Sequence, residues 1–379
     1  MIRKMMKPVA IATLCGALLS TTLAPAHALS LPATFISLAK SPTLRSPGIL
    51  VIDPDTGQTI FEHSPGRLRA PASVLKLIST TTALKTFGPE KKFVTTISET
   101  SDPTTFILTG DRDPWLTASA FEAKKYHRAY IPALINAVLA EHPDLKAITL
   151  EYANVNVTDL ALLQHFFHGR VEITVTPLTN AQGELAQPTK EISKISSPAL
   201  SEIIAFTLLY SDNQLANRLA VLSAKNLGFV GNVTGIQSAF EKTLKELNVP
   251  TGGLLVQDGS GLSHATRVST NTIASLLVEI KKNPDLHYIY DGLPLAGVTG
   301  TLKHRFVKDA PKAVGLVKAK TGWIDNTVSL AGYVTVGSKQ YVFAFIADHI
   351  INRESARSAA RETIDKMLAS IAKPAPKTA

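Results

Sequence analysis

Three short groups of polar residues in this chain have the side chains that serine-based acyl transfer requires. Ser73 and Lys76 form an S-x-x-K group, Ser211 and Asn213 bracket a Ser-Asp-Asn group, and Lys320 opens a Lys-Thr-Gly group. A serine hydroxyl becomes a good nucleophile only when a base removes its proton. Residues i and i+3 share one face of a helix. Lys76 could therefore be that base, provided that burial or a nearby positive charge lowers its pKa.

The other two groups offer the remaining parts of such a reaction. Lys320 could supply the nearby positive charge, and Asn213 could hold the lysine amine and hydrogen-bond a substrate amide. Ser211 could relay a proton to the leaving nitrogen. A cationic lysine beside the Thr321 hydroxyl suits a substrate that ends in a carboxylate. The backbone N–H groups of Ser73 and Trp323 are the natural donors to a developing oxyanion.

Context, and not the S-x-x-K spacing alone, selects Ser73. A four-residue S-x-x-K group is expected about once or twice by chance in a chain of this length, and Ser37 with Lys40 forms a second one. The alternative for Ser73 is a helix-capping serine next to a surface lysine. Ser73, however, follows a predicted hairpin, opens an apolar helix and is followed in order by the other two groups. We therefore expect Ser73 to be the nucleophile.

The elements that would position these residues alternate between strand-like and helix-like patterns. Apolar runs on either side of an Asp-Thr-Gly turn predict a hairpin, and Gly88-Pro89 ends the helix that follows Ser73. Strands at both ends of the chain with helices between them predict an α/β fold with an antiparallel sheet flanked by helices. The predicted strands are 49–52, 59–61, 254–256, 314–320, 328–336 and 341–347, and the predicted helices are 74–86, 200–247 with a break at 210–213, 271–282 and 353–371.

Residues 91–195 have a different sequence pattern, with short strand-like runs, and are predicted to form a small inserted α+β domain. Short β-type runs at 94–97, 106–108, 148–150 and 171–176 surround a predicted helix at 130–141. The catalytic domain would then consist of residues 29–90 and 196–379. Asp102, Asp111 and Asp113 in the insertion are interpreted as caps of turns, and no histidine spacing indicates a metal site.

The first 28 residues are predicted to be a secretory signal peptide. A basic start precedes a short apolar run, and Ala26-His27-Ala28 fits a cleavage site. Cys15, the single cysteine, would leave with it, so neither disulfides nor thiol chemistry is expected. The formal charge of +9 is scattered, which argues against nucleic-acid binding. We expect an exported protein of the periplasm or extracytoplasmic envelope, without a membrane anchor after cleavage.

Longer stretches around these groups resemble a known family. The three groups occur in this order in penicillin-binding proteins and class A β-lactamases. The chain is similar to the class C low-molecular-mass penicillin-binding proteins, the D-alanyl-D-alanine carboxypeptidase/endopeptidase family. The stretches that carry the resemblance are Pro71–Leu77, Ser197–Ile203, Tyr210–Asn217, Asp258–Ser263 and Leu293–Leu302.

The resemblance implies a penicilloyl-serine-transferase (β-lactamase-like) fold and removal of the terminal D-alanine from peptidoglycan stem peptides. It also implies that β-lactams acylate the protein. No cofactor is expected for this reaction. Carried over motif by motif, Ser73 is the nucleophile and Lys76 the base. The site is completed by Ser211, Asn213, Lys320 and Thr321.

Because of three departures from the family pattern, the sequence does not identify a single substrate. Ser73 and Ser211 lie 138 positions apart, which is short for this family. Trp323 follows Lys-Thr-Gly where a small or hydroxylic residue is common, and His264 stands where the family often has arginine. The alternatives are a D,D-endopeptidase that cuts crosslinks, a serine β-lactamase, and a non-catalytic peptidoglycan-binding protein. The sequence makes no prediction of oligomeric state.

Overall fold

A computed structural model describes residues 29–178 and 187–376 of the chain. The predicted signal peptide and Cys15 lie outside these residues. Within the described ranges, no helix combines the length and the apolar character needed to cross a membrane.

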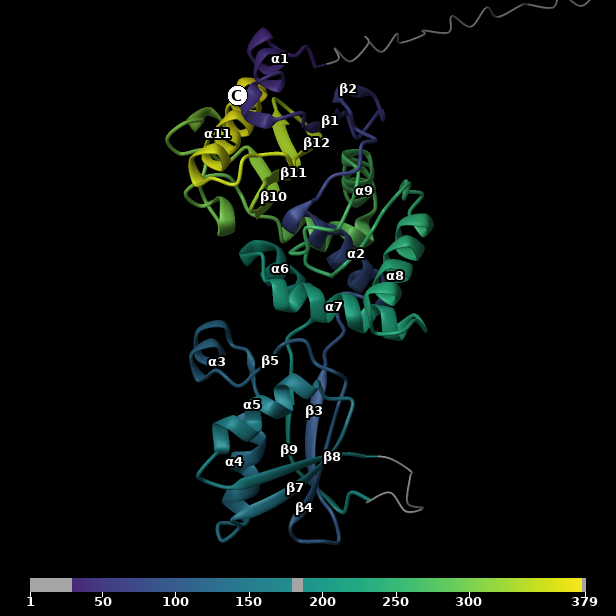
Figure 1. The fold of residues 1–379 in the computed structure, drawn as a ribbon, viewed down its shortest axis with the longest axis vertical. Coiled ribbons are helices and arrows are strands. Elements are labelled where there is room, and N and C mark those ends of the chain that lie inside the picture. The colour runs from purple at the N-terminus through teal and green to yellow at the C-terminus, as the bar shows by residue number, and fades with distance from the viewer. Residues whose placement is uncertain (1–28, 179–186, 377–379) are drawn as a thin grey trace, which may run out of the picture. The chain divides into compact units, whose positions relative to one another are not determined.

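The main sheet joins the two ends of the chain. Its five strands are antiparallel in the order β10-β11-β12-β1-β2 (Figure 1). Gly48 pairs with Ile346, so the first strand lies next to the last. The strands are β1 (Gly48–Ile52), β2 (Thr59–His63), β10 (Val317–Ile324), β11 (Thr327–Val336) and β12 (Lys339–Ala347).

Two predicted strands were wrong. Residues 254–256 form no strand, because only Leu255 pairs there, in an isolated bridge with Arg267. The other was placed wrongly. The sequence predicted residues 314–320, whereas β10 spans Val317–Ile324. Pairing with β11 continues through Ile324, opposite Thr327, and this pairing draws the following residues into the strand. The Lys-Thr-Gly group therefore lies inside β10 and not at its end.

Helices cover the sheet and fill the middle of the chain. β12 is buried along most of its length, which requires cover on both faces. α9 packs against β1 and β12, while α11 packs against β11 and α1 (Figure 1). The helices are α1 (Ala33–Ala39), α2 (Lys76–Phe87), α6 (Leu200–Tyr210), α7 (Asn213–Asn226), α8 (Val233–Glu246), α9 (Thr270–Lys282), α10 (His287–Asp291) and α11 (Glu354–Ile371). Short 3₁₀ turns are η1 (Pro42–Leu44), η2 (Ala72–Leu75), η3 (Pro284–Leu286), η4 (Gly300–Leu302) and η5 (Pro311–Ala313).

A second, mixed sheet is formed entirely within the segment predicted as an insertion. Its order is β8-β7-β4-β3-β9, with β4, β7 and β8 parallel and β3 antiparallel to both of its neighbours. From Leu31 onward the chain forms one compact unit, so the domain boundaries stay a prediction. The elements are β3 (Val94–Glu99), β4 (Thr105–Gly110), β5 (Leu116–Thr117), α3 (Ala120–Tyr126), β6 (Ala129–Tyr130), α4 (Pro132–Glu141), β7 (Ala147–Ala153), α5 (Val157–Phe167), β8 (Glu172–Pro177) and β9 (Lys190–Ser196).

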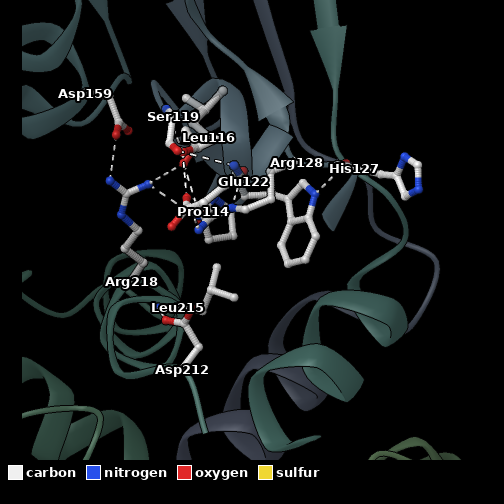
Figure 2. A network of polar contacts seen from close by, with 12 residues as sticks. Pro114, Leu116, Ser119, Glu122, His127, Arg128, Asp159, Asp212, Leu215 and Arg218 are labelled. Atoms are coloured by element: carbon white, nitrogen blue, oxygen red, sulfur yellow. Dashed lines mark hydrogen bonds and ion pairs between the residues drawn. The ribbon is translucent and has the colours of Figure 1, made fainter. Parts of the chain in front are cut away.

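Arg218 connects this segment to α7, the helix that begins at Asn213, and Arg128 supports the contact from within the segment. Arg218 of α7 lies 2.6 Å from Asp159 and donates to the carbonyls of Pro114 and Leu116. Arg128 donates to the same carbonyls from the other side (Figure 2). The turn between β4 and β5 is thereby held against α7, within two helical turns of the Ser-Asp-Asn group.

Candidate active site

Ser73 lies on the 3₁₀ turn η2, immediately before α2. Ala72 has φ of +50°, which is uncommon for a residue with a Cβ, and it turns the chain sharply before the serine. The approach to this turn is fixed from the sheet, because the backbone N–H of Ala70 donates to the Asp348 carboxylate at 3.0 Å. Asp348 directly follows β12, so the main sheet positions the nucleophile segment.

Lys76 brings together three segments that are far apart in the sequence. Its Nζ lies 2.8 Å from Ser73 Oγ, 2.7 Å from Asn213 Oδ1 and 2.8 Å from the Ser260 carbonyl oxygen. An ammonium group has three protons to donate, so each proton has an acceptor. The predicted contacts of Lys76 with Ser73 and Asn213 are both present, while the contact with Ser260 was not foreseen.

Burial lowers the pKa of Lys76 and so makes it suitable as a base. The side chain is fully buried, and burial lowers the pKa of Lys76 to about 8, against the opposing effect of the Asp258 and Asp212 carboxylates. A base with a pKa near the working pH transfers protons efficiently. The positive charge expected from Lys320 is therefore not the main cause of the lowered pKa.

Lys320 reaches the same site from β10. Its Nζ lies 2.8 Å from Ser211 Oγ and 2.8 Å from the Thr321 carbonyl oxygen. Burial, and after it the charge of Lys76, holds the pKa of Lys320 well below its usual value. Among the described residues, no carboxylate forms an ion pair with Lys320. A substrate carboxylate could take that place and return the charge to the lysine.

Ser211 and Asn213 occupy the sharp turn between α6 and α7. Ser211 has a left-handed backbone with φ of +59°, and the Asp212 side chain caps α7 by accepting the N–H of Leu215 at 2.9 Å. This turn directs Ser211 toward Lys320 and Asn213 toward Lys76. The sequence had predicted this break between two helices.

A loop around Asp258 supplies the third acceptor for Lys76. The Asp258 carboxylate accepts the N–H groups of Ser260, Gly261 and Ser263. Burial alone would raise the pKa of Asp258, but these hydrogen bonds outweigh it, so that the pKa is lowered. The charged carboxylate thereby fixes the Ser260 carbonyl. The Asp-Gly-Ser-Gly turn was visible in the sequence, but its role toward Lys76 was not.

Two glycines let the loop and β10 close onto the nucleophile turn. A Cβ on Gly261 would lie 1.9 Å from the Ala72 carbonyl oxygen, and one on Gly322 would lie 2.8 Å from the Pro71 carbonyl oxygen. Ser329 Oγ donates to that same Pro71 oxygen at 2.7 Å. The backbone next to Ser73 is therefore enclosed from both sides.

β10 forms one edge of the main sheet, and its outer edge faces the site. The N–H of Ala319 donates outward to the Pro294 carbonyl at 2.9 Å. Because N–H groups two residues apart on a strand point the same way, those of Thr321 and Trp323 belong to this outer edge. That direction fits the predicted oxyanion role of the Trp323 N–H. The indole itself packs against α11, with the Arg361 guanidinium 3.8 Å from the ring centre.

Two further predicted positions can be placed. Thr321 Oγ1 lies 2.9 Å from Thr301 Oγ1 of η4, a partner that the sequence did not indicate. His264, which stands where the family often has arginine, has its Nε2 3.3 Å from Asp325 Oδ2, and both side chains are exposed. His264 thus already has a carboxylate partner within the chain.

One cluster of side chains that can bind metal ions lies in the insertion, although no metal site was expected. Glu99, Glu141 and His142 could together offer three ligand atoms. The ammonium of Lys190 pairs with both glutamates, and it is the cation that this cluster holds.

Comparison with known proteins assigns the family. The sequence profile of the D-Ala-D-Ala carboxypeptidase 3 (S13) family matches residues 36–138 and 139–371. The chain belongs to this family. The predicted resemblance to class C low-molecular-mass penicillin-binding proteins is therefore confirmed.

Individual relatives agree with this assignment. The chain is 26% identical over 347 residues to a carboxypeptidase DacB of Mycolicibacterium smegmatis, covering 79% of this chain and 75% of the relative. It is 31% identical over 172 residues to the D-alanyl-D-alanine carboxypeptidase DacB of Haemophilus influenzae, covering 45% of this chain and 34% of the relative.

Solved structures show the same fold. Penicillin-binding protein 4 of Haemophilus influenzae superposes with a TM-score of 0.70 at 17% identity, over 88% of this chain and 97% of that one. A predatory endopeptidase of Bdellovibrio bacteriovorus has a TM-score of 0.60 at 15% identity, over 87% of this chain and 95% of that one. The predicted penicilloyl-serine-transferase fold is confirmed.

Proposed function

We propose that this protein is a serine D-Ala-D-Ala carboxypeptidase that removes the terminal D-alanine of peptidoglycan stem peptides through an acyl-Ser73 intermediate. The observation that carries the proposal is the position of the Lys76 amine, 2.8 Å from Ser73 Oγ and anchored by Asn213 and the Ser260 carbonyl. Membership of the S13 family supports the same reaction.

The geometry accounts for each step of acylation. The neutral amine of Lys76 takes the proton of Ser73, whose Oγ attacks the carbonyl carbon of the penultimate D-alanine. The N–H groups of Ser73 and Trp323 stabilise the oxyanion that forms. Ser211, hydrogen-bonded to Lys320, passes its proton to the leaving nitrogen and takes another from the Lys320 ammonium, and free D-alanine departs. Water then attacks the acyl-enzyme and gives a proton back to Lys320, while the Ser73 oxygen leaves and takes back the proton held by Lys76.

Substrate recognition follows from the buried cation and the open strand edge. A C-terminal carboxylate would pair with Lys320 and hydrogen-bond the Thr321 hydroxyl. The substrate backbone would lie along β10, and its amide would meet Asn213. Penicillins carry a similar carboxylate beside a reactive amide, and a solved relative from Haemophilus influenzae has a β-lactam bound. Acylation of Ser73 by β-lactams is part of the proposal.

The proposed place of action is the cell envelope outside the cytoplasm. It rests on the predicted signal peptide at residues 1–28 and on the location of peptidoglycan itself.

Labelling with a fluorescent penicillin, combined with D-alanine release from a synthetic pentapeptide, tests the proposal. We expect both in the unmodified protein and neither in Ser73→Ala. Ser37→Ala is a matched control, because Ser37 opens the second S-x-x-K group but lies exposed on α1. Label retained in Ser73→Ala, or no D-alanine released by the unmodified protein, would contradict the proposal.

The same acyl-enzyme could serve two other reactions. Splitting of purified crosslinked dimers faster than release of D-alanine would make the protein a D,D-endopeptidase. Rapid turnover of penicillin, in place of a long-lived adduct on Ser73, would make it a β-lactamase.

A further inference from the structure

A strip of exposed and half-buried side chains runs from helix α3 to the edge of the site. It consists of Phe121, Lys125 and Tyr126 on α3 and of Tyr210 at the end of α6, and we call it the aromatic strip. α3 has no buried residue. Phe121 is 66% exposed and Tyr210 is 52% exposed, although large apolar side chains are usually covered.

The members of the aromatic strip contact one another in sequence. Lys125 Nζ lies 5.1 Å from the centre of the Phe121 ring and 4.9 Å from that of Tyr126. The Tyr126 ring in turn lies 5.9 Å from the ring of Tyr210. Tyr210 directly precedes Ser211, so the strip ends at a residue of the proposed site.

Packing holds the site end of the strip in place while its outer end stays open. Phe206 of α6 contacts the rings of Tyr126 at 5.1 Å and Tyr210 at 4.6 Å, and it also contacts Trp115 at 5.0 Å. Phe121, by contrast, has only the Lys125 ammonium over its ring among the ring contacts of the described residues. An anchored row of exposed rings is typical of a binding surface and not of a core.

The chemistry of the strip suits a sugar. Pyranose rings have apolar C–H faces that pack on aromatic rings through dispersion and weak C–H contacts. The ammonium groups of Lys124 and Lys125 complement the carboxylates of an acidic stem peptide.

The length of the proposed substrate also agrees with a sugar near the aromatic strip. The four stem residues that remain after D-alanine leaves span at most about 13 Å when extended. The muramyl sugar must therefore lie close to the site whenever a stem peptide occupies it, and the aromatic strip begins at Tyr210, the residue before Ser211.

We propose that the aromatic strip binds the glycan of the peptidoglycan strand whose stem peptide occupies the site. The inference rests on the proposed function, because it names where the rest of that substrate lies. A glycan-bearing stem peptide would gain affinity over a free peptide with the same acyl-donor residues.

Paired substrates with and without the sugar test the inference. The measurement is kcat/KM for D-alanine release from a disaccharide-pentapeptide and from the free pentapeptide, in the unmodified protein and in Phe121→Ala. Because one ring contact with the sugar is lost, we expect Phe121→Ala to lose about threefold to tenfold on the disaccharide substrate. The free pentapeptide and the rate of penicillin acylation should be unchanged.

Leu162→Ala on α5 is the control, because Leu162 is 43% exposed in the same insertion but is not part of the strip. It should leave all three measurements unchanged. Equal loss on both substrates, or loss on neither, would overturn the inference. A change in molecular mass in solution on Phe121→Ala would also overturn it, since the strip would then be a contact between copies. Failure of the proposed function would look different, because the unmodified protein would release D-alanine from neither substrate.

Discussion

At the scale of single residues, Lys76 should make acylation depend on pH. Its pKa of about 8 means that at neutral pH only a minority of molecules hold the neutral amine that accepts the proton of Ser73. We expect the second-order rate constant for penicillin acylation to rise about tenfold from pH 7 to pH 9 and then to level off. Rapid-mixing measurements with a fluorescent penicillin check this. A rate constant that is flat over this range would contradict Lys76 as the base.

Residue chemistry was also what the sequence predicted best. Ser73, Lys76, Asn213, Ser211 and Lys320 could be named because their three short groups follow the order known from penicillin-binding proteins, and the fold brings them within hydrogen-bond distance of one another in two sets. The Ser260 carbonyl could not be named in the same way, because every residue has a carbonyl and only the folded loop directs this one. The sequence left two causes open for a lowered pKa of Lys76, burial or a nearby positive charge, and only the packed fold shows that burial is the larger one.

At the scale of elements, the approach of β10 to η2 should not tolerate a side chain at position 322. A Cβ on Gly322 would lie 2.0 Å from Ser329 Oγ and 2.8 Å from the Pro71 carbonyl oxygen. We expect Gly322→Ala to destabilise the protein by about 1–3 kcal/mol through overpacking and to slow penicillin acylation by displacing the turn of Ser73. Urea unfolding and labelling rates measure the two effects.

Gly66→Ala is the matched control, because no atom lies within 4 Å of a Cβ built at Gly66. It should change neither stability nor labelling. If Gly322→Ala labelled at the normal rate, the close approach would not matter for the position of Ser73.

Elements were predictable where one periodic pattern dominated. The hairpin of β1 and β2, the break before α7 and the strands β11 and β12 all lie where the sequence placed them. β9 was missed because Lys190–Ser196 has only two apolar residues, Ile192 and Ile195, without the alternation of a half-buried strand, and has no buried residue. The bounds of β10 were shifted because its pairing with β11, and not its own apolar run, decides where the strand ends.

At the scale of the whole molecule, the contact between the insertion and α7 should make stability depend on pH. Asp113, interpreted from the sequence as a turn cap, does accept the N–H of Trp115 at 2.8 Å, but it is fully buried. It directly precedes Pro114, whose carbonyl belongs to the network in Figure 2. Burial raises the pKa of Asp113 to about 7. Between the unfolded value near 4 and this folded value, the folded state binds more protons, so stability falls as pH rises.

Asp113→Asn should remove this dependence. The amide keeps an oxygen for the N–H of Trp115, and the second oxygen of Asp113 has no hydrogen-bond partner, so little is lost. From pH 5 to pH 7 we expect the unmodified protein to lose about 2–3 kcal/mol relative to the variant. Chemical denaturation of both proteins across this range measures the difference. Parallel pH curves would show that Asp113 does not titrate in the folded protein.

The outer edge of β10 has a consequence for self-association. An unpaired strand edge is a template on which a second chain can add, and proteins usually shorten or cover such edges. Here Leu295 pairs with Lys318 and covers the first part of the strand, which leaves residues 321–324 for a peptide. Four residues are too few to hold two sheets of neighbouring molecules together, yet they suffice for one stem peptide to add as a strand. The short open edge therefore allows substrate binding but disfavours aggregation.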